Sequence, residues 1–247
     1  MDPVLIILAA SSGAAAASAL GVLPLLRRGA VSSTWLGWSN AAAAGLMLAG
    51  AFVLFDAAVD VAVVPFGIGA VAGIAFIALS HLLSGSDEHE FNQPGSKDPA
   101  YGYAVLMDGS LHSSAEGVAF GAAMAVDPAM GMFLALVMAV HNVPEGTLLG
   151  AVFASRGVRL GRAALLAVFA NVTQVLFGVT TYAVVQAAPA ALPWALGFAA
   201  GALVYLVMVD LLPESYRQAG ATSIALVTIL AMGLFALMHA WLQGAAP

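Results

Sequence analysis

The chain has 247 residues, of which 62% are hydrophobic and only 8% are charged, and its formal net charge is −6. Roughly a quarter of the residues of an ordinary soluble domain are charged, so this composition excludes a soluble globular protein. The chain contains no cysteine, which excludes disulfides and thiolate metal ligands.

Repeated apolar runs of about 20 residues predict transmembrane helices, because a helix of that length crosses the hydrocarbon core. We predict an all-α polytopic membrane protein, with a single transmembrane domain over residues 1–247. The predicted spans are 3–26, 34–55, 62–84, 101–126, 129–154, 160–186, 191–213 and 221–243. The boundary between the second and third spans, from Asp56 to Asp60, is the least well defined by the sequence. Seven spans are therefore the alternative to eight.

The positive charges predict the orientation of the chain. All seven Lys and Arg residues fall in alternate connections: Arg27, Arg28, Lys97, Arg156, Arg159, Arg162 and Arg217. The positive-inside rule places these connections in the cytoplasm, so we expect both termini outside. The acidic Asp2 precedes the first span and the basic pair Arg27 and Arg28 follows it, which indicates a retained helix rather than a cleaved signal.

Two short motifs place a histidine and a glutamate four residues apart, on one face of a helix. They are His112-Ser-Ser-Ala-Glu116-Gly in the fourth span and His141-Asn-Val-Pro-Glu145-Gly in the fifth. Because these spans are antiparallel and both motifs fall near the bilayer midplane, we expect His112 to face Glu145 and Glu116 to face His141. Two imidazoles and two carboxylates suit a divalent ion such as Zn²⁺.

The energy of the buried charge favours a metal site. Two glutamates at the bilayer centre cost about 5–7 kcal/mol together, which a bound dication or shared protons would offset. The alternative is a buried His/Glu network that only joins helices. Pro144 removes a helix hydrogen bond beside the ligands, and irregular backbone at this depth is tolerated where it lines a cavity.

Carboxylates on the cytoplasmic side suggest a route for the ion. Asp108 lies one turn before His112, where it could relay a metal ion or a proton inward or merely stand at a helix end. The polar segment 85–100 is predicted to be a cytoplasmic loop. Its residues Asp87, Glu88, His89 and Glu90 either capture emerging metal or form a solvated charge run.

Other polar residues inside the spans have simpler interpretations. Asn171 and Gln174, in the sixth span, either form hydrogen bonds between helices or line the site. His81 and His239 lie near predicted helix ends without partners at ligand spacing, so we leave both outside the site.

The chain resembles the ZIP family of divalent-metal transporters over essentially its whole length, in a prokaryotic-type form. The second motif matches the family's histidine-asparagine-x-proline-glutamate-glycine pattern, and the first matches the sister motif less closely. Weaker matches lie at 19–24 and 203–214. The resemblance implies a bundle of three, two and three helices in the cell membrane, and it implies a homodimer. It also implies import of Zn²⁺, Fe²⁺, Mn²⁺ or related ions such as Cd²⁺ into the cytoplasm.

The resemblance also implies a set of site residues. The primary site would comprise His112, Glu116, His141 and Glu145, with Met47 as a further ligand, and a second site would use Ser113, Asn142 and Gln174. The family more usually has asparagine or aspartate at the position of Ser113, and some members have a carboxylate at that of Gln174. A serine and two amides carry no charge, so we predict one tightly held metal rather than two.

The sequence thus predicts a transporter that moves divalent metal ions, most simply Zn²⁺, by alternating access, with the metal as substrate and the lipid bilayer as surroundings. We expect neither enzymatic activity nor a nucleic-acid partner. One alternative is an intramembrane zinc-dependent hydrolase, which would need a general base and a bound water. Another is a proton-coupled transporter of a non-metal substrate that uses the same carboxylates.

Overall fold

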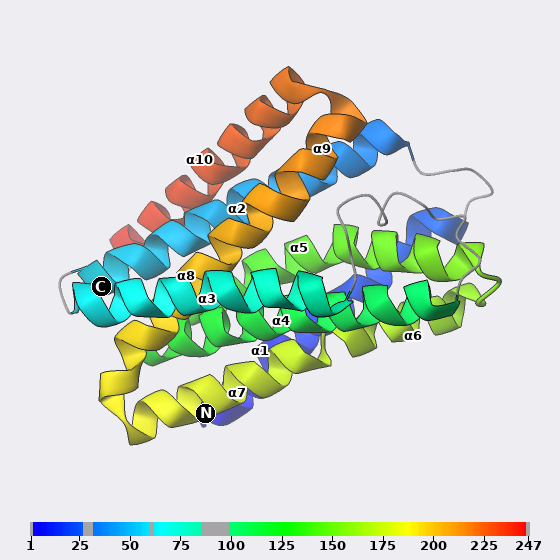
Figure 1. The fold of residues 1–247 in the computed structure, drawn as a ribbon. Helices are drawn as coiled ribbons and strands as arrows, with labels where there is room; N and C mark the ends of the chain where they lie inside the picture. Colours follow the sequence, from blue (N-terminus) through cyan, green and yellow to red (C-terminus); the bar gives the residue numbers. More distant parts are fainter. Residues whose placement is uncertain (1, 27–31, 60–61, 85–98, 246–247) are drawn as a thin grey trace.

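The computed structural model describes residues 2–26, 32–59, 62–84 and 99–245, and all regular structure in these residues is helical (Figure 1). The elements are α1 (Pro3–Ala17), η1 (Ser18–Leu26), α2 (Ser33–Val59), α3 (Val63–Ser84), α4 (Pro99–Val126), α5 (Pro128–Ser155), α6 (Leu160–Ala170), α7 (Val172–Ala187), η2 (Pro189–Ala191), α8 (Leu192–Leu206), η3 (Val207–Leu211), α9 (Leu212–Ala219) and α10 (Ala221–Ala245).

The predicted all-α membrane architecture is confirmed. Among the described residues, seven helical segments are long and apolar enough to cross a membrane. The eighth predicted span is α4, which carries the polar residues of the first motif. α1 begins and α10 ends toward the same end of the bundle, as an even number of spans requires (Figure 1). Which side of the membrane that end faces stays a prediction.

Several predicted spans are interrupted rather than continuous. The first continues α1 as the 3-10 helix η1, which contains Pro24. The sixth breaks at Asn171, between α6 and α7, and the seventh passes through the π-helical turn η3. The predicted loop 85–100 ends two residues early because α4 begins at Pro99. Its remaining residues, 85–98, include Asp87, Glu88, His89 and Glu90 and lie outside the described part of the chain.

The helices pack in two groups. In one, α3 packs on α8, and α2 packs on α8, α9 and α10; in the other, α4 packs on α7, and α5 packs on α1, η1 and α6. The α4–α5 hairpin joins them, since α4 also contacts α3 and α8 while α5 contacts α2. The predicted order of three spans, a central pair and three spans therefore holds along the sequence. In space, however, each packing group combines helices from the N-terminal and the C-terminal parts of the chain.

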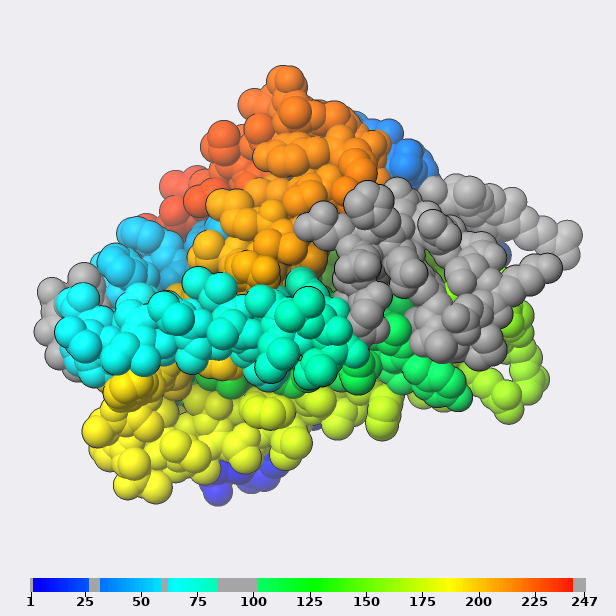
Figure 2. Space-filling model, viewed as in Figure 1, coloured from blue at the N-terminus to red at the C-terminus, as the bar shows by residue number. Residues whose placement is uncertain are grey.

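The outer surface is apolar, as a lipid-facing surface must be. Figure 2 shows α3 running along the outside of the molecule. Its exposed side chains include Val64, Val71 and Leu82, which are 72%, 66% and 80% exposed. In α10, the last helix of the chain, Leu230 and Leu237 are 70% and 72% exposed.

Glycines let the helices of one group approach closely. Gly69 and Gly73 of α3 face the backbone of α8, and Gly197 and Gly201 of α8 face the backbone of α3. At Gly73 an added methyl group would overlap the carbonyl oxygen of Phe198. Small residues allow such contact in lipid, where apolar surface gives helices no reason to associate. Gly197 and Gly201 therefore serve helix packing, since an added methyl group at either would overlap the backbone of Phe66 or Ala70.

The substitution Gly73→Ala should destabilise the fold, because the new methyl group has no room. Overpacking of this kind costs about 1–3 kcal/mol. Gly67→Ala is the matched control on the same helix, since a methyl group there meets nothing within 4 Å. In thermal unfolding of the purified chain in detergent, Gly73→Ala should lower the midpoint and Gly67→Ala should not. Equal midpoints for the two variants would contradict the packing described.

Candidate metal site

A tight hairpin brings the two motifs together. Asp127 alone connects α4 to α5, and its carboxylate accepts a hydrogen bond from the backbone N–H of Met130 at 3.1 Å. Pro128 follows as the first residue of α5, a position where a missing N–H costs nothing. The two helices are therefore antiparallel neighbours, and His112 and His141 lie at similar distances from the turn.

One of the predicted pairs is in direct contact. His141 Nε2 lies 3.0 Å from Glu116 Oε1, and both residues are buried, at 6% and 2% exposure. His141 Nδ1 and Glu116 Oε2 have no hydrogen-bond partner among the described residues. Burying such groups unsatisfied is costly, so this pair is suited to a ligand that is not part of the chain.

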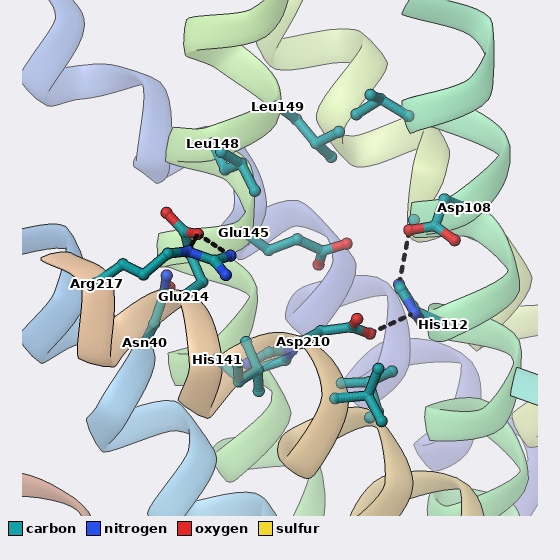
Figure 3. Close-up of a pocket in the computed structure, with 15 residues that line it drawn as sticks. Asn40, Asp108, His112, His141, Glu145, Leu148, Leu149, Asp210, Glu214 and Arg217 are labelled. Carbon is teal, nitrogen blue, oxygen red and sulfur yellow. Dashed lines mark hydrogen bonds and ion pairs between the residues drawn. The ribbon is translucent and has the colours of Figure 1, made fainter. Parts of the chain in front are cut away.

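The other predicted pair is only partly as expected. His112 and Glu145 line the same cavity, of about 120 Å³, together with His141 (Figure 3). Glu145 is at the limit of hydrogen-bond distance from Asn171, whose Nδ2 lies 3.4 Å from Glu145 Oε2. Among the described residues, however, His112 is paired with Asp108 and Asp210 rather than with Glu145. Its Nδ1 lies 3.5 Å from Asp108 Oδ2, and its Nε2 lies 3.4 Å from Asp210 Oδ2.

The residues of the implied second site bond to one another and to neighbouring helices. Ser113 donates to Asn171 Oδ1 at 2.8 Å, and Asn142 donates to Gln174 Oε1 at 3.1 Å. Asn142 also donates to the carbonyl of Ala14 at 2.8 Å, which ties α5 to α1. All four side chains are buried. Asn171 and Gln174 therefore form hydrogen bonds between helices, one of the two roles considered for them.

Two further predicted residues lie in different surroundings. Asp108 is fully buried and lines the cavity beside His112, on the side where α4 begins. Met47 of α2 is 4% exposed within the main apolar core and does not line the cavity. Asp108 is therefore placed to meet an ion in the cavity, whereas the structure gives Met47 a packing role.

We left His81 outside the site because it has no partner at ligand spacing, but the structure brings it beside two site residues from distant parts of the chain. His81 Nε2, from the end of α3, lies 3.2 Å from His112 Nε2 and 3.2 Å from Asp210 Oδ2. These three atoms form a cluster that could hold a metal ion. Asp210 belongs to η3, and sequence reasoning missed it as a site residue. The signal was there, because a carboxylate within an apolar span marks a functional site by default.

The cavity extends in one direction from the motifs. Its lining runs from His112 to Val105 on α4 and from His141 to Leu149 on α5, and it reaches Arg217 of α9. Arg217 is itself partly exposed, and it is paired with Glu214 at 2.6 Å. This end also carries Arg156 and Arg159, between α5 and α6, and it is predicted to be cytoplasmic. On the opposite side the buried core residues Phe120, Met124, Leu134 and Met138 fill the space.

Comparison with known proteins agrees with these features. The family model described as ZIP Zinc transporter matches residues 78–240, which include both motifs, His81 and Asp210. A putative zinc transporter of Arabidopsis thaliana is 30% identical over 215 residues, a region that covers 85% of this chain and 35% of that protein. The chain thus spans about a third of the length of that relative.

The family match covers more than half of the chain, and it falls on the helices that carry the buried histidine and carboxylate pairs. The chain is therefore a multi-pass membrane protein that belongs to the ZIP zinc transporter family, a family of transporters rather than enzymes.

Proposed function

We propose that this protein imports divalent transition-metal ions into the cytoplasm, with Zn²⁺ as the first candidate and Fe²⁺, Mn²⁺ and Cd²⁺ as alternatives. The observation that carries the proposal is the buried contact between His141 and Glu116. His141 also lines the cavity, together with Glu145 and His112. Membership of the family and the name of the Arabidopsis relative support it.

The site chemistry explains why an ion would bind. Glu116 and Glu145 together can neutralise a dication, and His141 and His112 offer neutral nitrogen ligands. The ion would offset the cost of two carboxylates at membrane depth. Because nitrogen and oxygen sites bind divalent ions in a similar order of affinity, these ligands alone do not rank the metals.

The shape of the cavity supports alternating access. Among the described residues, the cavity lining extends from the motifs toward the predicted cytoplasmic end. We take this arrangement as a state that has just released an ion or is about to release one. To receive an ion from outside, the packed core on the other side must open, by rocking or sliding of the site-bearing helices against α2, α3 and α8. We expect the transporter to act in the cell membrane, as a homodimer.

Neutral side chains beside the primary site favour one ion at a time. Ser113, Asn142 and Gln174 carry no charge, and they already bond to Asn171, to one another and to Ala14. A second dication there would share only the two glutamates. Family membership also favours transport over the intramembrane hydrolase that the sequence left open.

The variants Glu145→Ala and His112→Ala should each abolish metal uptake, because each removes a ligand of the primary site. The measurement is uptake of labelled Zn²⁺, Fe²⁺, Mn²⁺ and Cd²⁺ into proteoliposomes. His239→Ala is the control, since His239 stacks on Phe235, and neither residue lines the cavity. Normal uptake by both site variants would show that the site is assigned wrongly.

Purified wild-type chain should retain one tightly bound Zn²⁺ after equilibrium dialysis. Elemental analysis of the metal against protein concentration gives the ratio. We expect only one ion because Ser113 and Gln174 carry no charge that could hold a second one. Two tightly bound ions per chain would rule out the single-ion account.

A further inference from the structure

One ion pair that lines the cavity has no part in the proposed metal site. Glu214 and Arg217 lie one turn apart in α9, and both line the cavity (Figure 3). The guanidinium of Arg217 donates twice to Glu214 Oε2, from Nε at 3.0 Å and from a terminal nitrogen at 2.6 Å. The other carboxylate oxygen, Oε1, accepts a hydrogen bond from Gln218 Nε2. Both oxygens of Glu214 are therefore bound by groups of the chain itself.

Arg217 is the one permanently positive group among the described residues that line the cavity. The same lining contains four carboxylates, those of Asp108, Glu145, Asp210 and Glu214. A guanidinium stays protonated in proteins and has no lone pair to offer a metal ion. Arg217 therefore acts on a cation in the cavity only through its positive charge and through the carboxylate that it holds.

The pair lies in the direction in which the proposed import releases the ion. Asp210 of η3 and Glu214 of α9 belong to one span, and four residues of helix advance about 6 Å. The side chain of Glu214 is 17% exposed and that of Arg217 is 46% exposed, so the guanidinium is the more accessible of the two to water. An ion that leaves the primary site toward the predicted cytoplasmic end passes Asp210 first and Glu214 second.

Without its partners, Glu214 would help to retain a departing ion. Residues four apart share one face of a helix, and both Asp210 and Glu214 line the cavity. Two carboxylates on one face offer a divalent ion oxygen ligands and neutralise its charge. Transport, however, requires binding that is weak enough for the ion to leave. The bonds from Arg217 and Gln218 remove the charge and the oxygen atoms of Glu214 from what the ion can bind.

We propose that Arg217 is a positioning residue for ion release, which holds Glu214 so that this carboxylate and Asp210 do not retain the ion at the end of the cavity. The role of Arg217 in transport rests on the proposed function, whereas its effect on the dissociation of a bound ion does not. The simpler alternative is that the pair only stabilises α9, as surface ion pairs at this spacing do to a small extent. That role would leave the release of metal unchanged when Arg217 is replaced.

The experiment measures how fast bound Zn²⁺ leaves the protein. The full chain is purified in detergent, loaded with Zn²⁺ and mixed rapidly with an excess of chelator, whose absorbance reports the released ion. Arg217→Gln removes the charge, and Arg162→Gln is the matched control, because Arg162 is an exposed residue of α6 that does not line the cavity. Size-exclusion chromatography checks the fold. If Arg217→Gln is not monodisperse, Arg217→Met, which keeps most of the apolar stem, replaces it.

Arg217→Gln should slow the release of Zn²⁺ about two- to fivefold, the factor that corresponds to one exposed ion pair. Adding Glu214→Gln should restore the wild-type rate, because no carboxylate is then left without its partner. Arg162→Gln should release Zn²⁺ as fast as the wild type. A wild-type rate in Arg217→Gln would overturn the proposal, and so would a double variant that stays slow. Equal slowing by Arg162→Gln would overturn it as well, since the effect would then follow net charge alone.

The release rate also separates the two proposals, because it is measured in detergent, where no transport takes place. A wild-type chain that takes up no metal into proteoliposomes would refute the proposed import, whereas slower release by Arg217→Gln and its reversal by Glu214→Gln would still stand. Normal uptake together with unchanged release would leave the import proposal intact and overturn the role of Arg217.

Discussion

Carboxylates buried in an apolar bundle are the constraint on which the rest of this structure depends. Glu116 and Asp108 are almost completely buried, and Glu145 lines the cavity beside them. Charged groups at this depth are tolerated only where partners satisfy them. The chain supplies two kinds of partner, the imidazoles of His141 and His112 and the amide of Asn171. Glu116 Oε2 and His141 Nδ1 still lack hydrogen bonds within the described residues, so a ligand from outside the chain can satisfy them.

The metal site lies between the two helix groups. Close glycine packing joins α3 to α8 in one group, and Gly117 and Gly121 let α4 approach the backbone of α7 in the other. The site residues of α4 and α5 therefore lie where two compact units meet. His81 and Asp210 belong to one unit and His112 to the other, so movement between the units would change which ligands an ion can reach. Binding and movement are thereby coupled through His112.

The sequence was sufficient for the parts of the fold that follow from local patterns. Apolar length predicted the spans, and the four-residue spacing with antiparallel helices predicted the contact between Glu116 and His141. It was insufficient where distant helices meet. His81 has no ligand-spaced neighbour in its own helix, because its partners lie 31 residues or more away in sequence. The breaks at Asn171 and η3 were also missed, since hydropathy does not register a change in helix type.

The central claim is that a metal ion binds between the two motifs, and locating the ion tests it most directly. Crystals of the full chain soaked in Cd²⁺ would give an anomalous scattering peak at the ion. The account predicts that the strongest peak lies between the two motifs, within bonding distance of Glu116, Glu145 and His141. A strongest peak elsewhere in the membrane-embedded part of the molecule, with none between the motifs, would contradict it.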